Sequence, residues 1–302
     1  MRDDVAVRIS RHVLGLVFLA LAFMLPMAGQ KIQQAPAGRP NAAPASAEPR
    51  DPDVDAAAQE IGRALFLRCF CADNNLSFDI QGKPQGPVKI TDWTLSGINV
   101  QKAVRKGPGE VELDGVRVAV RYATDRHEFD RHPENDDKMR LTLADNVDTA
   151  AFTRELQSVF STGIDRPLQR SMPDFWQHYF DPSMAWPQDA LTGQQIVTFA
   201  GPPVAAGGAA SEPTVTHRAE AGYTPLASRD RVTGTVQVRM VVDVEGLPRH
   251  VVIVQPLGYG LDVRAVEAAA KFRFTPATLK GKAVASTVLL NQDFLLVPPP
   301  PH

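Results

Sequence analysis

The sequence predicts an α+β protein that carries two folded regions behind an apolar N-terminal segment. Three observations support this fold class. Residues 56–180 contain many short runs in which apolar and polar residues alternate, as they do in half-buried strands. Residues 221–298 show two further alternating runs, a short helical pattern and a closing strand, in that order. Before and between these regions lie Ala-, Gly- and Pro-rich stretches that lack the large apolar side chains of a core.

The apolar N-terminal segment, residues 1–29, is predicted to be a signal peptide or a membrane anchor. Arginines precede an unbroken apolar run from Val13 to Leu25, which is shorter than the roughly 20 residues that a spanning helix needs. A cut after Ala28 would place Pro26 at the third position before it, where secretory cleavage sites prefer small residues. We therefore expect export to the periplasm, and the sequence leaves open whether the segment is removed or stays as an inner-membrane anchor.

Two stretches of the chain are predicted to be linkers. Residues 30–55 are rich in Ala and Pro and contain almost no large apolar residue, a composition that favours an extended, semi-stiff tether. Residues 181–220 include a second Gly-, Ala- and Pro-rich stretch, with a brief strand expected at Ile196 to Phe199. The linkers thus delimit two domains, at residues 56–180 and 221–298.

Residues 56–180 are predicted to form a β-rich domain with one amphipathic helix. Glycines punctuate its alternating runs, and Asp114-Gly115 between two of them indicates a hairpin turn. A helix is expected to start after Asp148, because the apolar residues that follow recur at helical spacing: Phe152, Leu156, Val159 and Phe160. The region is therefore expected to be a meander of strands with a helix near its end.

Three features of this region have both a structural and a functional interpretation. Cys69 and Cys71 share one strand face, so two buried thiols, an intermolecular bond and a bridge between them all stay open, whereas a metal site lacks further ligands nearby. The aromatic run Phe175–Phe180 fits an exposed recognition patch or, as we expect, a cover for the open face of the meander. The run Asp125–Asp137 mixes histidines with carboxylates, but its histidines share neither a helix face nor a strand face, so we expect a solvated acidic loop rather than a metal site.

Charge and motifs exclude several classes of function. A formal net charge of -2 over 302 residues, without a clustered basic face, argues against nucleic-acid binding. The chain has no Gly-x-Ser-x-Gly elbow, no His-Glu-x-x-His, no phosphate-binding loop and no dinucleotide fingerprint after a strand. We therefore expect a protein that is not an enzyme and that uses no cofactor or metal.

The C-terminal region, residues 221–298, is predicted to be a ββαβ unit. Apolar and polar residues alternate from Thr235 to Asp243, with only Val241 out of step, as in a half-buried strand. Glu245-Gly246 then supplies a residue that tolerates positive φ, and the β-branched run from Val251 to Val254 resumes an extended structure. The two runs are therefore expected to form a hairpin.

A short helix and a closing strand follow this hairpin. Between Leu261 and Lys271 the apolar residues recur at helical spacing, and Asp262 is placed to cap or favour the first turn. The rest of the unit contains alternating aromatic residues, a proline that blocks a ladder N–H, a turn and the final strand: Phe272, Phe274, Pro276, Lys280–Lys282 and Val284–Val297.

This order of elements resembles the C-terminal domain of TonB-family proteins. The similarity rests on short motifs in matching order: Tyr223-x-x-x-Ala227, Gly234-x-Val236, Val242-Asp243-x-x-Gly246, Gly260-Leu261-Asp262, the segment Phe272 to Ala277 with Phe274 and Pro276, and Gly281 with Val284. Phe272 stands where the family most often has Trp, so the aromatic side chain is kept without the indole donor. The resemblance is confined to the last part of the chain.

The resemblance implies that the C-terminal domain binds a partner peptide by adding it as a strand. In TonB proteins this peptide belongs to an outer-membrane transporter, and an inner-membrane motor complex supplies the energy. A small antiparallel sheet has the unpaired edge that such pairing needs. The last strand is the candidate edge because its charge is low, and the residues expected to contact the partner are Val288, Leu289, Leu290, Asn291, Gln292, Asp293 and Phe294.

The N-terminal segment lacks the motif through which the motor would be contacted. TonB anchors resemble one another in a Ser-x-x-x-His pair, whereas here Ser10 is followed four residues later by Leu14, and His12 is preceded four residues earlier by Arg8. The alternative is a periplasmic adaptor or scaffold that uses the same domain to bind another envelope protein without energy coupling. A homodimer is a further arrangement that the sequence permits.

Overall fold

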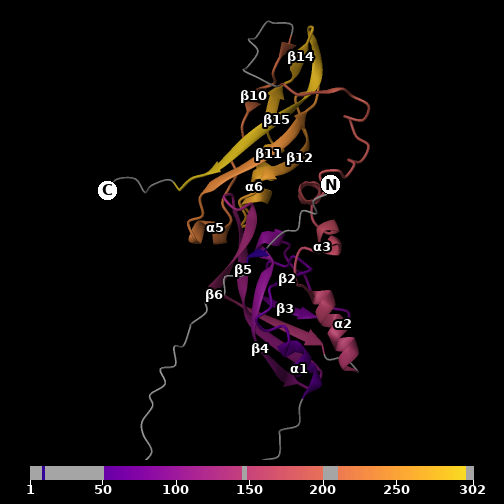
Figure 1. Ribbon diagram of the computed structural model, residues 1–302, viewed down its shortest axis with the longest axis vertical. Helices are drawn as coiled ribbons and strands as arrows, with labels where there is room; N and C mark the ends of the chain where they lie inside the picture. Colours follow the sequence, from indigo (N-terminus) through magenta and orange to yellow (C-terminus); the bar gives the residue numbers. More distant parts are fainter. Residues whose placement is uncertain (1–8, 11–50, 145–147, 200–209, 297–302) are drawn as a thin grey trace, which may run out of the picture.

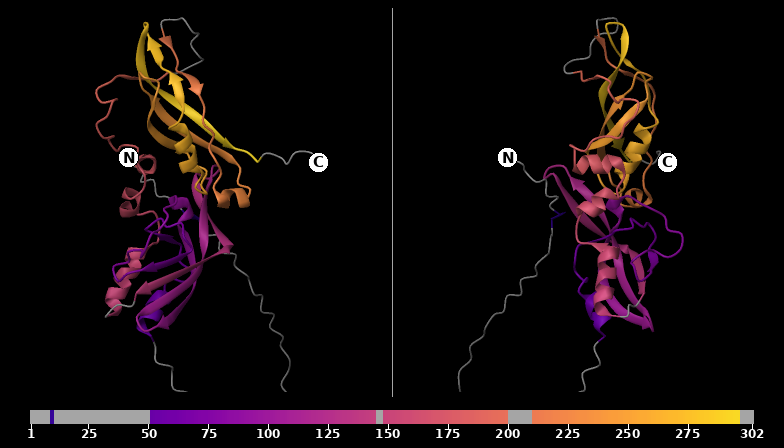
Figure 2. Two further views of the ribbon diagram at one scale, coloured as in Figure 1. Left: turned by 180° about the vertical axis from the view of Figure 1, so that it is seen from behind. Right: turned by 90° about the vertical axis from the view of Figure 1, so that its right-hand side faces the viewer.

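The protein has the mixed α+β fold that its sequence predicts, with two folded regions that meet end to end along the long axis (Figure 1, Figure 2). The computed structural model describes residues 9–10, 51–144, 148–199 and 210–296. The predicted signal peptide or anchor and most of the first linker lie outside the described residues, apart from β1 (Ile9–Ser10). No helix in the described part of the chain combines the length and the hydropathy of a membrane span.

The middle region is built on one mixed sheet, seen in the lower half of Figure 1. Its strands lie in the order β1-β6-β5-β4-β2-β7, and β3 runs parallel to β6 beside them. The apolar faces of α1 (Pro52–Ala58) and α2 (Thr149–Val159) complete the core of this sheet. The strand bounds are β2 (Leu65–Leu67), β3 (Asn75–Phe78), β4 (Gly97–Gly107), β5 (Glu110–Ala123), β6 (Glu128–Ala144) and β7 (Phe160–Ser161).

The helix predicted after Asp148 is confirmed as α2. The Asp148 carboxylate accepts a hydrogen bond from the backbone N–H of Ala151 at 2.6 Å and so satisfies a donor of the first turn. Phe152, Leu156 and Val159 are buried on its inner face, as their spacing predicts. The helix ends where the chain becomes extended to pair with β2 as strand β7.

The hairpin predicted at Asp114-Gly115 is wrong, because both residues lie inside β5. A Cβ on Gly115 would lie 2.5 Å from the carbonyl oxygen of Asn99 in the neighbouring strand. The register of β4 shifts beside this contact, between Val100 and Lys102. The glycine therefore permits a close approach of two strands at an irregular position and does not reverse the chain.

The solvated loop predicted at Asp125–Asp137 is also wrong for most of its length. Only residues 124–127 form a turn, and the rest belongs to β6, where His132 lies opposite Ala119 and Phe129 lies opposite Tyr122. Pairing with the long strand β5 holds these polar residues in an extended structure, which the local composition did not indicate. No group of three or more metal-ligating side chains occurs among the residues that the structure describes.

Cys69 and Cys71 form a disulfide, one of the options that the sequence left open. The loop around them is held by Arg117, whose buried guanidinium donates hydrogen bonds to the carbonyl oxygens of Leu95 at 2.6 Å and Ala72 at 2.9 Å. One charged side chain thus joins the disulfide loop to the sheet by several hydrogen bonds.

The aromatic run at the end of the middle region is buried at Phe175 and Trp176 and half-buried at Tyr179 and Phe180. Phe175 and Trp176 belong to α4 (Asp174–Phe180), which follows α3 (Arg166–Arg170). The Trp176 ring lies 5.4 Å from that of Trp93, in the short helix η1 (Trp93–Leu95). The same apolar cluster includes Ile253 of the C-terminal region, so these rings fill the space where the two folded regions meet.

The C-terminal region has the predicted ββαβ order, in the upper half of Figure 1. Its main sheet runs β12-β11-β15-β14-β9, in which β14 pairs only with the first residues of β15, Lys282 to Val284, and α6 packs on β11 and β12. The short linker strand β8 also pairs with β15, β10 pairs with β13 in a separate two-stranded sheet, and α5 precedes β11. The bounds are β8 (Ile196–Val197), β9 (Ala210–Ser211), β10 (Thr214–His217), α5 (Pro225–Arg229), β11 (Gly234–Val242), β12 (Pro248–Gln255), α6 (Leu261–Ala269), β13 (Arg273–Thr275), β14 (Ala277–Leu279) and β15 (Lys282–Phe294).

The turn between β11 and β12 is fixed by Asp243 and Gly246. The fully buried Asp243 carboxylate accepts hydrogen bonds from the Leu247 N–H at 2.8 Å and from Arg249 Nε at 2.9 Å. Gly246 has a φ of +81°, and its carbonyl accepts a hydrogen bond from the Phe274 N–H at 3.0 Å. The turn therefore anchors the segment that follows α6.

The other motif residues lie in the core or at turns of the same unit. Tyr223 packs edge-on against Phe294 at a ring distance of 5.5 Å. Leu261, Phe272 and Phe274 are buried beneath the sheet, and Gly234 opens β11. Pro276 separates β13 from β14, and Gly281 lies in the turn before β15.

Replacing Gly246 tests the turn. In Gly246→Ala the new Cβ would lie 2.0 Å from the Phe274 carbonyl oxygen at a positive φ. We expect a loss of about 3 kcal/mol in the free energy of unfolding, measured by urea titration. Gly281→Ala is the matched control, because φ there is +75° but nothing lies within 4 Å, and it should lose only about 1 kcal/mol. Equal losses would show that contact with Phe274 is unimportant.

Candidate partner-binding edge

One side of β15 is filled by β11. The two strands pair antiparallel without interruption, from Gly234 opposite Phe294 to Val242 opposite Ser286. The register places the alternating apolar residues of both strands on the face that α6 covers. The predicted contact residues Val288 to Phe294 all lie within this ladder.

The other side of β15 is open over most of its length. Ser286 pairs with Val242 of β11 and also with Val197 of β8, so β8 must lie on the side of β15 away from β11. β8 covers only Ala285 and Ser286 there. From Thr287 to Phe294 no strand in the described part of the chain pairs with this outer side. The predicted edge is thus geometrically free, and its role in binding stays a prediction.

The side chains of the edge alternate between core and solvent. Leu290, Gln292 and Phe294 are buried on the helix face, whereas Leu289 is 56% exposed on the opposite face. Two polar residues on the face of the sheet away from α6 form hydrogen bonds with side chains of β11. The Asn291 side chain accepts from Gln237 at 3.2 Å, and the Asp293 carboxylate accepts from the Thr235 hydroxyl at 2.6 Å. Among the described residues, the buried Gln292 Nε2 has no hydrogen-bond acceptor. Leu289 is therefore the accessible apolar side chain of the edge.

The opposite margin of the sheet, β12, is covered. α4 lies beside it, and the Trp186 ring stacks between His178 at 3.7 Å and His250 at 4.2 Å. His250 Nε2 also lies 3.0 Å from an Asp189 carboxylate oxygen. An incoming strand would therefore find β12 shielded and β15 accessible.

The two folded regions are joined by backbone hydrogen bonds at the tip of β5. The Tyr259 N–H donates to the Val120 carbonyl at 2.9 Å, and the Tyr122 N–H donates to the Leu257 carbonyl at 3.0 Å. A Cβ on Gly258 would lie 2.1 Å from the same Val120 oxygen, so only glycine allows this approach. The loop before α6 is thus held by the middle region.

Side chains reinforce the junction. Arg229 of α5 pairs with the buried Glu134 of β6, and the Tyr259 hydroxyl donates to Glu134 at 3.2 Å. Thr94 of η1 accepts a hydrogen bond from the N–H of Gly260 at 2.8 Å. This junction could not be predicted from the sequence, because its partners are far apart along the chain, and the Gly260-Leu261-Asp262 motif indicates a helix start but not what the loop before it contacts.

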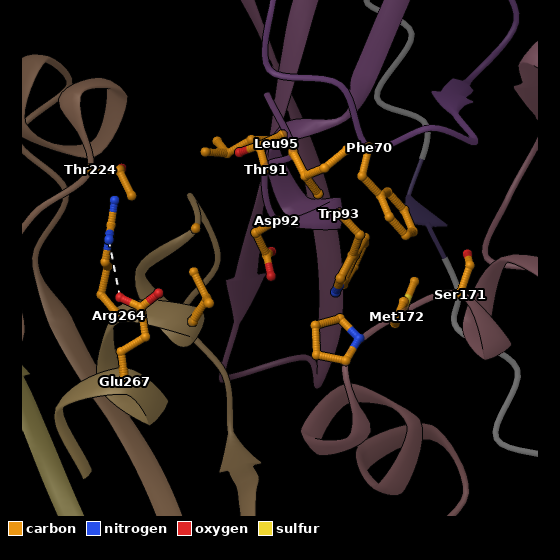
Figure 3. A pocket seen from close by; sticks show the side chains of 14 residues that line it. Phe70, Thr91, Asp92, Trp93, Leu95, Ser171, Met172, Thr224, Arg264 and Glu267 are labelled. Atoms are coloured by element: carbon orange, nitrogen blue, oxygen red, sulfur yellow. Dashed lines mark hydrogen bonds and ion pairs between the residues drawn. The ribbon is translucent and has the colours of Figure 1, made fainter. Parts of the chain in front are cut away.

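A pocket of about 570 Å³ lies at this junction (Figure 3). Phe70, Trp93 and Met172 form an apolar wall, and the Arg264–Glu267 ion pair lies across from it. The Asp92 carboxylate lies between these two sides. It accepts hydrogen bonds from Trp176 Nε1 at 2.7 Å, from the Thr94 hydroxyl and from the Thr94 N–H. Asp92 therefore ties α4 to η1.

Asp92 has a second buried carboxyl nearby, that of Asp262 in the first turn of α6. Burial and the charge of Asp92 raise the pKa of Asp262 to about 8, although hydrogen bonds from the Leu257 and Gly258 N–H groups act in the opposite direction. Burial likewise raises the pKa of Asp92. The sequence predicts that Asp262 caps or favours the first turn of the helix, and it does so by accepting hydrogen bonds from the loop before α6. Gly260 is the N-cap residue of α6 and has a left-handed conformation.

The comparison with known families agrees with the motifs. The family model described as Gram-negative bacterial TonB protein C-terminal matches residues 219–296. The matched residues begin just before Tyr223 and contain β11, β12, α6 and β15, and they do not include the middle region. No curated protein matches the chain.

The two buried carboxyl groups predict a pH dependence of stability. A carboxyl whose pKa is about 8 in the folded state, against roughly 4 when unfolded, binds its proton more strongly in the folded protein. Its contribution to stability is therefore complete at low pH and is lost as the pH rises toward 8. We expect the urea midpoint to fall between about pH 5 and about pH 8.

The variant Asp92→Asn should make this fall less steep, because it removes the neighbouring charge that raises the pKa of Asp262. Asp125→Asn is the control, since that carboxylate is 76% exposed at the β5–β6 turn. An unchanged slope in Asp92→Asn, measured by tryptophan fluorescence, would contradict the coupling between the two carboxyl groups.

Proposed function

Because residues 219–296 belong to the TonB C-terminal family, we propose that this cell-envelope protein binds an extended peptide of an outer-membrane transporter along the outer side of β15. The observation that carries the proposal is the open edge from Thr287 to Phe294. The proposal assigns the chain no catalytic activity and no cofactor.

The backbone of the open edge supplies the affinity. Alternate residues between Thr287 and Phe294 direct their N–H and C=O groups away from β11, and an added strand would pair with them. The only charged side chain in this stretch is Asp293, so little repels an approaching strand. Edges protected against pairing usually carry several charges, prolines or bulges, and Thr287–Phe294 has no proline, no bulge and only one charged residue, Asp293.

The side chains beside the edge supply selectivity. Residues of an added strand would alternate between the face of Leu289 and Asn291 and the face of Val288 and Gln292. An apolar residue would gain contact with Leu289, which is otherwise exposed. The partner is therefore an extended, uncharged segment with apolar residues at alternate positions.

The proposal includes a role in energy transduction for transport across the outer membrane. This role requires export to the periplasm and an N-terminal segment that stays in the inner membrane as an anchor. The second candidate, a periplasmic adaptor without energy coupling, is favoured by the absence of a Ser-x-x-x-His pair at Ser10 and His12. The intact mass of the exported protein separates the two, because a chain that begins near Gly29 or Gln30 cannot be coupled directly to a motor.

Site-directed cross-linking tests the edge. The two native cysteines are joined to each other, so a cysteine introduced elsewhere provides the free thiol. We expect Leu289→Cys and Asn291→Cys, expressed in the envelope, to form adducts with the plug-region peptide of an outer-membrane transporter, identified by mass spectrometry. The control Thr216→Cys is also at an exposed position, on β10, but has no open edge of the main sheet beside it. The same adducts from Thr216→Cys, or none from β15, would contradict the proposal.

A further inference from the structure

The second linker is fastened to the C-terminal region just before it reaches β15. Trp186 stacks on His250, and Asp189 pairs with the same histidine at 3.0 Å. Leu191 is buried in a small apolar cluster with Val241 and Ala285. The linker is thus held at several points on the outer face of the sheet, which brings β8 next to the edge.

β8 pairs in parallel with the beginning of the edge. Ile196 lies opposite Ala285, and Val197 lies opposite Ser286. The hydroxyl groups of Thr198 and Thr287 lie 3.4 Å apart, in the direction in which the pairing would continue. β8 therefore lies on the same side of β15 as the open edge and occupies the two residues directly before it.

We propose that β8 is an internal competitor that blocks the start of the outer side of β15, at Ala285 and Ser286, against an incoming strand. The identity of the natural strand with which β8 competes rests on the proposed function. The pairing of β8 with β15 is a property of this chain alone. A partner strand that pairs from Ala285 onward must displace β8, whereas one that begins at Thr287 meets its end. In both cases the linker limits how much of the edge is available.

The contact is suited to displacement. β8 has only two paired residues, and Ile196 stays 41% exposed, so little apolar surface is buried by it. Its tether keeps its effective concentration at the edge high, so it rebinds whenever the edge is empty. The apparent affinity of an incoming strand is reduced by the fraction of molecules in which β8 is bound.

A peptide that copies β8 tests the block with a defined probe. A fluorescein-labelled peptide with the sequence of Gln194 to Phe199 is titrated with the full chain, and binding is followed by fluorescence anisotropy. In the double variant Ile196→Pro, Val197→Pro the tethered strand loses its N–H donors. We expect the peptide to bind this variant about fivefold more tightly than the unmodified chain, the factor of one net hydrogen bond of about 1 kcal/mol.

The control variant Ile196→Thr, Val197→Thr keeps both N–H groups and β-branched side chains, so its peptide affinity should stay within about twofold of the unmodified chain. Circular dichroism verifies that all three proteins fold alike. Equal peptide affinity in the three proteins would overturn the block. Tighter binding in the threonine variant as well would overturn it too, because backbone pairing would then not be the cause.

Cross-linking of Leu289→Cys in the same backgrounds separates this inference from the proposed function. More transporter adduct in the proline background supports competition with the natural partner. Adducts that form equally in all backgrounds overturn the competition and leave the proposed function intact. A peptide effect without any transporter adduct overturns the proposed function and supports the block.

Discussion

The antiparallel ladder between β11 and β15 is the interaction on which the C-terminal region depends. It aligns the apolar residues of both strands under α6 and places β11 between two paired neighbours. Because α4 and the stack around Trp186 shield β12, the ladder leaves β15 as the accessible margin of the main sheet in the described part of the chain. The fold of the sheet and its open edge are thus consequences of one register.

The middle region supports this sheet from one end. Backbone hydrogen bonds at Val120, the Thr94–Gly260 contact and the apolar cluster around Trp93 and Ile253 join the two regions without a continuous sheet. The loop before α6, which carries the Gly-Leu-Asp motif, is held by both regions at once. The orientation of the edge relative to the middle region is therefore set by this junction, to which Trp186 of the linker contributes by stacking between His178 and His250.

Local patterns predicted the ββαβ unit, because alternation in β11, helical spacing after Leu261 and a glycine at the turn are all properties of neighbouring residues. They failed at Asp114-Gly115, where the same dipeptide that favours a turn instead admits the Asn99 carbonyl of another strand. The linker strand was expected near Ile196, but its pairing with β15 depends on contacts made by Trp186 and Leu191. Such long-range contacts leave no periodic signal in the sequence.

The ladder also has a mechanical consequence. The hydrogen bonds between β15 and β11 form a row that runs along the strand axis. A strand added to β15 would lie parallel to that row. Force applied along that axis loads all of these hydrogen bonds together in shear, whereas force across it would break them one after another. A short sheet with this geometry can resist traction by a bound ligand in the direction of its strands while remaining easy to peel apart sideways.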